Sequence, residues 1–146
     1  MRLARALAVL LAALAAAPAF ALDTPARAAV VVDITSGATL LEKNADRPLP
    51  PASMSKLMTL YMVFEALDQG RLEMDDRFPV SEEAWRKGGS KMFVRVGDRI
   101  SIENLLYGVT VQSGNDACIV LAEGLGGTED NFAEMMNARA EEMGLE

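Results

Sequence analysis

The sequence predicts an α/β chain, in the α+β arrangement, in which a β-hairpin precedes a block of helices. Residues 28–34 form a β-branched run and residues 38–43 a second apolar run, with Thr35-Ser36-Gly37 between them as a loop of three to four residues. After residue 50, apolar side chains recur at helical spacing instead. Because two strands alone make a poor sheet, we expect an antiparallel sheet that is incomplete in this chain.

The helical block begins after residues 47–51, which hold three prolines and must be irregular. Pro51-Ala52-Ser53 opens a long helix that Gly70 stops, and its apolar residues cover most faces, which predicts a central position. Residues 71–80 suit a connection into a short strand. Further helices are expected over residues 81–85, 101–111, 116–125 and 128–143. Ser101 and Thr128 are the expected N-caps of the second and fourth of these, and Gly144 stops the last one.

The first 21 residues have the pattern of a secretory signal peptide. Arg2 and Arg5 give a positive start, residues 6–17 are an unbroken apolar run, and Ala19 and Ala21 place small residues where signal peptidase acts. We therefore expect cleavage after Ala21 and secretion across the inner membrane into the periplasm. A membrane anchor is the alternative, and it is disfavoured because the run is shorter than the roughly 20 residues of a spanning helix.

The balance of charge excludes one class of partner. The chain carries a net charge of −7, and removal of Arg2 and Arg5 with the signal peptide takes it to −9. Nucleic acid is therefore not an expected partner, because binding phosphates requires a basic surface.

The residues that are absent or rare narrow the chemistry. The chain has no histidine, so a Ser-His-Asp triad, a Cys-His pair and the common zinc sites are excluded, and a catalytic base must be Lys, Asp, Glu or Tyr. We expect no metal and no cofactor. The single cysteine, Cys118, allows no internal disulfide and lies in an apolar run, which predicts a small core residue rather than a reactive thiol.

Ser53 and Lys56 are the first candidate catalytic pair. Residues three apart share one face of a helix, so this spacing places an amine beside a hydroxyl at a helix start, where backbone N–H groups are free. A neutral lysine can take the serine proton where no histidine exists. The alternative is a capped helix start with a solvated lysine, which is the commoner meaning of this spacing taken alone.

Ser113 and Asn115 are the second candidate pair, on an interruption between two apolar helices. A hydroxyl held there can relay a proton, and an amide can donate to and accept from a substrate peptide group. Helix capping is the alternative for this pair, because Ser and Asn both favour helix starts.

Taken together, the two motifs resemble the Ser-x-x-Lys and Ser-Asp-Asn patterns of class A β-lactamases and penicillin-binding proteins. With glycine at its centre, Ser113-Gly114-Asn115 resembles the low-molecular-mass penicillin-binding proteins, the serine-type D-alanyl-D-alanine carboxypeptidases of peptidase family S11. The likeness covers nearly all of residues 22–146 and includes residues 28–37, 51–59, 89–93, 105–118 and 132–145.

The resemblance implies the serine β-lactamase and D,D-peptidase (transpeptidase-like) fold, an antiparallel sheet packed on a helical region with the nucleophile helix between them. It implies a peptidoglycan stem peptide ending in D-Ala-D-Ala as substrate, and β-lactams as covalent inhibitors. Ser53 would be the nucleophile, Lys56 the general base, Ser113 the proton relay and Asn115 the substrate-binding amide. A membrane surface would be a further partner through a C-terminal anchor outside this chain.

One departure from the family pattern matters. The third motif, Lys-Thr-Gly or Lys-Ser-Gly, is absent, because none of the four lysines precedes Thr-Gly or Ser-Gly. We therefore expect residues 22–146 to be the N-terminal part of a D,D-peptidase domain, truncated before that strand and inactive alone. A D,D-endopeptidase and a class A-like β-lactamase are the enzyme alternatives, and a non-catalytic remnant of a broken gene is the alternative from another class.

Overall fold

A computed structural model describes residues 23–145 of the chain. The chain divides into two units, Met1–Leu49 and Pro50–Glu146, which are described separately. The expected signal peptide, residues 1–21, lies outside the described residues. No helix among residues 23–145 combines the length and the apolar character that crossing a membrane requires.

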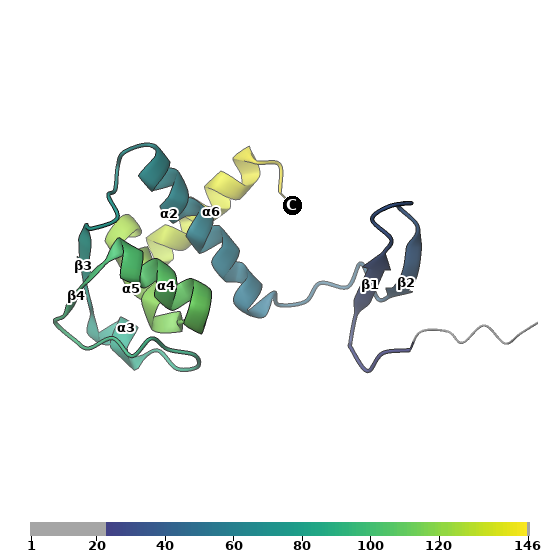
Figure 1. The fold of residues 1–146 in the computed structure, drawn as a ribbon, viewed down its shortest axis with the longest axis horizontal. Coiled ribbons are helices and arrows are strands. Elements are labelled where there is room, and N and C mark those ends of the chain that lie inside the picture. Colours follow the sequence, from purple (N-terminus) through teal and green to yellow (C-terminus); the bar gives the residue numbers. More distant parts are fainter. Residues whose placement is uncertain (1–22, 146) are drawn as a thin grey trace, which may run out of the picture. The chain divides into compact units, whose positions relative to one another are not determined.

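The described part of the first unit is the predicted antiparallel β-hairpin (Figure 1). Strand β1 covers Ala29–Val32 and strand β2 covers Thr39–Lys43, with Ala29 opposite Lys43 and an irregularity in register between Val31 and Val32. The loop prediction was wrong, because six residues, 33–38, lie between the strands rather than three or four.

The longer loop has a local cause in Asp33. One carboxylate oxygen of Asp33 accepts hydrogen bonds from the backbone N–H groups of Thr35 at 2.8 Å and Ser36 at 3.3 Å, an arrangement typical of aspartate in turns. The bond from Thr35 is the largest cause, and the bond from Ser36 the next, of a pKa of Asp33 that lies below its ordinary value. The backbone of Asp33 then closes the loop by bonding to Ala38 and Gly37.

The second unit contains the predicted helices, together with short strands (Figure 1). Its elements in order are the 3-10 helix η1 (Ala52–Ser55), α2 (Lys56–Asp68), β3 (Arg77–Pro79), α3 (Glu82–Arg86), β4 (Arg99–Ser101), α4 (Ile102–Gln112), α5 (Asn115–Gly126) and α6 (Glu129–Glu142). The expected helix starts are confirmed at two caps, where the hydroxyls of Ser101 and Thr128 accept backbone N–H groups three residues on.

Strand β4 was not predicted. It pairs antiparallel with β3, with Phe78 opposite Ile100, and β4 leads directly into α4. At three residues it is too short for alternation of apolar and polar residues to mark it in a sequence.

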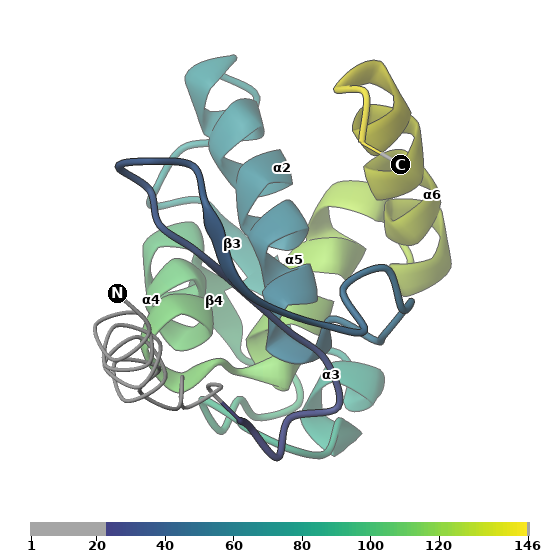
Figure 2. The same ribbon diagram turned by 90° about the vertical axis from the view of Figure 1, so that its right-hand side faces the viewer.

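Helix α5, rather than α2, is the centre of the helical unit, which corrects the expectation for the helix after Ser53. Helix α5 contacts α2, α3, α4, α6 and β3 (Figure 2). Small and apolar residues on most of its faces, among them Ala117, Val120 and Leu121, are buried and allow this close approach from several directions. In contrast, α2 leaves Leu57 67% and Phe64 49% exposed.

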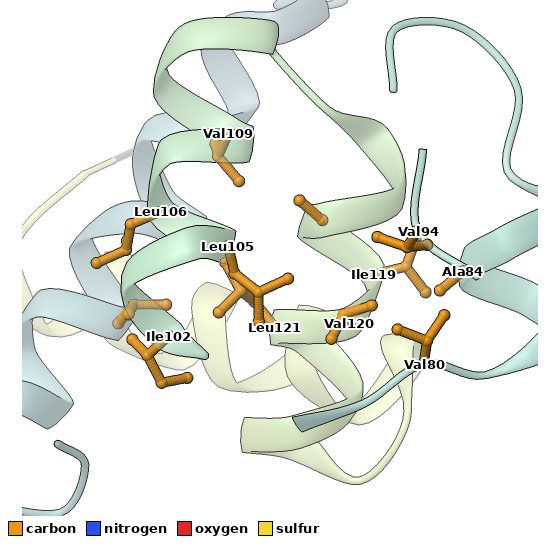
Figure 3. Close-up of a cluster of buried hydrophobic side chains, with 12 residues drawn as sticks. Val80, Ala84, Val94, Ile102, Leu105, Leu106, Val109, Ile119, Val120 and Leu121 are labelled. Atoms are coloured by element: carbon orange, nitrogen blue, oxygen red, sulfur yellow. The ribbon is translucent and has the colours of Figure 1, made fainter. Parts of the chain in front are cut away.

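The main core lies between α4, α5 and the β3–β4 ribbon (Figure 3). Leu105, Val120 and Leu121 are fully buried at its centre, and Ala84 of α3 extends it together with Val80 and Val94 from the connecting segments. A smaller cluster around Phe132 fixes α6, and there Arg139 binds both Glu65 and Tyr61 of α2. The start of α5 is thus anchored in a packed framework.

Candidate active site

Ser53 lies on a tight turn that precedes α2. The turn is closed by the N–H of Met54, which donates to the carbonyl of Pro51 at 3.1 Å, and by the hydroxyl of Ser55, which donates to the carbonyl of Ala52 at 2.8 Å. Ala52, immediately before Ser53, has a φ of +50°, in the left-handed region that non-glycine residues rarely adopt. Such a conformation costs about 1–3 kcal/mol, and in folded proteins it concentrates at functional sites. The turn presents an exposed Ser53.

Lys56 is the first residue of α2, and its side-chain nitrogen reaches both candidate motifs. Its Nζ lies 3.3 Å from the Oγ of Ser53, 3.0 Å from the Oγ of Ser113 and 2.6 Å from the carbonyl oxygen of Ser113. All three oxygens are within hydrogen-bonding distance of the nitrogen. The lysine is therefore held between two hydroxyls and is not a freely solvated surface side chain.

Ser113 completes a triangle of reactive groups. Its hydroxyl lies 3.1 Å from the Oγ of Ser53. Each pair among Lys56 Nζ, Ser53 Oγ and Ser113 Oγ is within hydrogen-bonding distance, so a proton can pass between any two of them. Ser113 ends α4 in the left-handed conformation, with a φ of +53°, and this turn directs the chain into α5.

Gly114 makes the close approach behind Ser113 possible. It is buried, and its N–H donates to the carbonyl of Gly108 at 2.9 Å. A Cβ at this position would lie 2.9 Å from a carboxylate oxygen of Asp116 and 3.2 Å from the backbone nitrogen of Met92. Glycine is therefore required at the centre of Ser113-Gly114-Asn115 by packing.

Asn115 begins α5 and is held by the neighbouring loop. Its side-chain amide donates to the carbonyl of Gly88 at 2.7 Å, and its backbone N–H donates to the carbonyl of Ser90 at 2.8 Å. With the amide nitrogen engaged, the amide oxygen is the group positioned to accept a substrate N–H. Between the two anchors, Gly89 has a φ of +82°, and a Cβ there would lie 2.5 Å from the Asn115 amide nitrogen.

Asp116 was not predicted as part of the site. It is fully buried, and its carboxylate accepts four backbone hydrogen bonds of 2.9–3.2 Å. The donors are the N–H groups of Met92, Phe93, Val94 and Ala117. A buried carboxylate of this kind is stabilised by its donors rather than by an opposite charge. Its sequence signal was its place directly after Asn115, but three of its four donors are more than twenty residues away.

A cavity of about 230 Å³ adjoins Lys56 and Asn115. Lys87 and Glu129, which form an ion pair at 3.3 Å, contribute its charged lining, and Phe132 and Met136 contribute apolar lining. Among residues 23–145, no group of three His, Cys, Asp or Glu side chains is placed to hold a metal ion.

Cys118 lies one turn into α5 and also lines the cavity. It is partly buried, and desolvation raises the pKa of its thiol to about 11, although the nearby positive charge of Lys56 acts in the opposite direction. At neutral pH only a very small fraction of Cys118 is therefore present as the thiolate, which fits the expectation of an unreactive packing residue.

The four candidate residues come together at one place, and the capping alternatives were wrong. No side chain caps η1 or α2, and Gly114, not Ser113 or Asn115, occupies the N-cap of α5, again without a side-chain bond. Sequence reasoning missed the strained Ala52 and the buried Asp116. A positive φ and a backbone-bound carboxylate leave no periodic pattern in a sequence.

Comparison with known proteins places the chain in a family. The family model described as peptidase S11, D-alanyl-D-alanine carboxypeptidase, matches residues 12–146. The chain is 40% identical over 120 residues to D-alanyl-D-alanine carboxypeptidase DacF of Bacillus subtilis, covering 82% of this chain and 31% of the relative. It is 42% identical over 126 residues to DacC of Escherichia coli, covering 82% of this chain and 32% of the relative. The chain thus spans about a third of the length of these curated relatives.

Solved structures agree on the fold. The chain matches the D-alanyl-D-alanine carboxypeptidase DacD of Francisella tularensis with a TM-score of 0.73 and 43% identity, over 88% of this chain and 31% of that one. It matches penicillin-binding protein 5 of Haemophilus influenzae with a TM-score of 0.72 and 39% identity, over 86% of this chain and 38% of that one. The expected D,D-peptidase fold, incomplete in this chain, is confirmed, and the chain belongs to the peptidase S11 family of D-alanyl-D-alanine carboxypeptidases.

Proposed function

We propose that this chain forms the nucleophile-bearing part of a serine-type D-alanyl-D-alanine carboxypeptidase that shortens peptidoglycan stem peptides in cell-wall biogenesis. The observation that carries the proposal is the contact of Lys56 Nζ with the hydroxyls of both Ser53 and Ser113, in a chain without histidine. Membership of the S11 family supports the same activity and substrate.

In the acylation step, Ser53 Oγ attacks the carbonyl carbon of the penultimate D-Ala, and neutral Lys56 takes the hydroxyl proton. The backbone N–H of Ser53 would stabilise the developing oxyanion, together with a second donor from outside this chain. The C–N bond to the terminal D-Ala then breaks. The leaving amine receives its proton from Lys56 by way of Ser113.

Acylation leaves the shortened peptide as an ester on Ser53. Water then attacks this ester, Lys56 accepts a proton from the water, and Ser53 Oγ recovers its proton as the peptide leaves. Asn115 would hold the substrate throughout, because its amide oxygen is directed away from the bond with Gly88.

β-Lactams would acylate Ser53 by the same route, because their strained amide mimics the D-Ala-D-Ala bond. Support comes from Listeria monocytogenes penicillin-binding protein D2, which has been solved in an ampicillin-bound form and is 32% identical to this chain with a TM-score of 0.68. We also propose export to the periplasm through residues 1–21, with attachment to the outer face of the inner membrane if an anchor exists elsewhere in the protein.

A D,D-endopeptidase that cuts cross-links is a second candidate. The observation favouring it is a 33% identity over 118 residues to a D-alanyl-D-alanine endopeptidase of Pseudomonas aeruginosa, of which the chain covers 37%. The carboxypeptidase remains preferred because the relatives at 40% identity and above carry that name.

The absence of the Lys-Thr-Gly motif from residues 1–146 affects the activity expected of this chain by itself. We propose that residues 22–146 do not complete turnover by themselves, and that the third motif lies elsewhere in the protein. A reading frame that continues to Lys-Thr-Gly or Lys-Ser-Gly would support this proposal. A stop codon directly after Glu146 would instead favour the non-catalytic remnant.

The activity is tested on the full-length product of the gene. The protein is incubated with a monomeric pentapeptide ending in D-Ala-D-Ala and, separately, with cross-linked dimers, and D-Ala release and dimer cleavage are measured. We expect release of D-Ala from the pentapeptide, and its loss in Ser53→Ala. Preferential cleavage of dimers would favour the endopeptidase, and no hydrolysis of either substrate by the folded protein would contradict both.

A further inference from the structure

We propose that Asp116 is a positioning residue, which latches the loop of residues 88–94 to the start of α5 and thereby holds Asn115 in its substrate-binding orientation. The proposal rests on the proposed function, because it concerns how that site is kept in shape. Asp116 itself is fully buried and acts through the loop and Asn115.

The carboxylate links two segments that are distant in sequence. One oxygen accepts from Met92 at 3.0 Å and from Ala117 at 2.9 Å, and the other accepts from Phe93 at 2.9 Å and Val94 at 3.2 Å. Three of the four donors thus belong to the loop and one to α5. A neutral amide in place of the carboxylate would turn an NH₂ group toward N–H donors and lose two of these bonds.

The loop held in this way does not have a relaxed conformation. Phe93 has a φ of +64° and is 81% exposed, so neither its backbone preference nor burial of its ring favours the observed conformation. Its N–H is one of the donors to Asp116. The bonds to the carboxylate therefore fix the backbone of residues 92–94, together with the packing of Met92 and Val94 against the core.

The same loop carries the anchors of Asn115. The carbonyl of Gly88 accepts the side-chain amide, and the carbonyl of Ser90 accepts the backbone N–H of the same residue. Gly89 between them is packed against the amide nitrogen. When the latch at residues 92–94 opens, these two carbonyls lose their fixed position, and the Asn115 amide loses its orientation with them.

The experiment is a double-mutant cycle on penicillin acylation in the protein as its gene encodes it, measured below the melting temperature of every variant. Asp116→Asn is made with Asn115 intact and in Asn115→Ala. We expect acylation to slow about tenfold or more in the first background and less than about threefold in the second, because residues acting through one another are not additive. Val120→Ala, a core change one turn further along α5, serves as the stability control and should give equal factors in both backgrounds.

Equal slowing by Asp116→Asn in both backgrounds would overturn the proposal and leave Asp116 with a role in folding alone. If Asp116→Asn does not fold, Gly89→Ala tests the link from the exposed loop, since its Cβ would displace the Asn115 amide. Gly89→Ala should slow acylation only where Asn115 is present, and an absence of effect there would also overturn the proposal.

Hydrogen exchange separates failure of the latch from failure of the proposed function. The amides of Met92, Val94 and Asn115 should exchange faster in Asp116→Asn than in Val120→Ala, whether or not the protein reacts with penicillin. Unchanged exchange at these amides would overturn the latch. A wild-type protein that is never acylated would overturn the proposed function, and the exchange rates would then decide the latch on their own.

Discussion

The turn that carries Ser53 is held by bonds between near neighbours, whereas the start of α5, which carries Asn115, is held by a loop far away in the sequence. The turn before α2 is closed within four residues, by Pro51 with Met54 and by Ala52 with Ser55. No residue of η1 is buried. On the opposite side of the site, Gly114 is buried against Gly108, and Asn115 is bonded to a loop more than twenty residues earlier.

This difference explains which changes each side should tolerate. A site placed by local bonds depends on a few side chains and on the backbone angles between them. A site placed by packing depends on the volume of its residues, so even one added methyl group lowers the stability of the fold there. We therefore expect chemical losses without structural loss at Ser53 and Lys56, and structural losses at the start of α5.

The largest effect is expected from removing the nucleophile. Ser53→Ala should abolish penicillin labelling and D-Ala release while leaving the melting temperature nearly unchanged, because Ser53 is exposed and packs against little. Labelling and thermal denaturation are measured together. Ser36→Ala, an exposed serine of the hairpin loop, is the matched control, and labelling that survives in Ser53→Ala would refute the nucleophile assignment.

The next largest effect is expected at Lys56. Lys56→Ala should slow acylation by about 10²–10⁴-fold, the usual contribution of a positioned general base, and the fold should remain intact. The acylation rate is measured by stopped-flow with a fluorescent penicillin. Lys43→Ala removes a lysine of β2 that is bound to the carbonyl of Thr24 within the first unit, and should acylate normally. A normal rate in Lys56→Ala would rule out its role as the base.

A pair of backbone substitutions sharpens the comparison through stability. Gly114→Ala should destabilise the protein by about 1–3 kcal/mol, because the added Cβ meets Asp116 and Met92 in a filled space. Ala52→Gly should change the free energy of unfolding by less than about 1 kcal/mol, since relief of the left-handed φ offsets the greater freedom of glycine in the unfolded chain. Denaturant titration measures both, and equal losses would remove the distinction between the two sides.

The smallest effect concerns the thiol on the packed side. Desolvation raises the pKa of Cys118 from 9.0 to about 11. At pH 8 the population of its thiolate is therefore about a hundredfold smaller than for an ordinary cysteine, and alkylation by iodoacetamide should be slower by about the same factor. The alkylation rate should rise with pH up to about 11. The same protein unfolded in guanidinium chloride is the control, and equal rates in the two states would show that the start of α5 is not packed as described.

The same division between local and distant contacts decided what the sequence could predict. The spacing of Ser53 and Lys56 and the caps Ser101 and Thr128 are local features, and they were recognisable as residue patterns. The hairpin was recognisable from its β-branched runs, but the length of its loop was not, because Asp33 extends it through side-chain bonds.

Features that depend on tertiary contacts escaped prediction. The central position of α5, the burial of Asp116 and the strained conformation of Phe93 arise only when the loop and α5 meet. Ser113 and Asn115 were identified by their residue types in combination with the first motif, although capping was the commoner meaning of this pair taken alone. The structure excludes capping, because Gly114 occupies the N-cap of α5 without a side-chain bond.

The central claim is that Ser53 is the group that reacts. The protein as its gene encodes it is incubated with benzylpenicillin, quenched and digested, and the peptide that carries the added penicilloyl mass is identified by mass spectrometry. We predict a single adduct on the peptide containing Ser53, formed in the wild-type protein and absent from Ser53→Ala. An adduct on another residue, or a folded wild-type protein that acquires no added mass, would contradict the account.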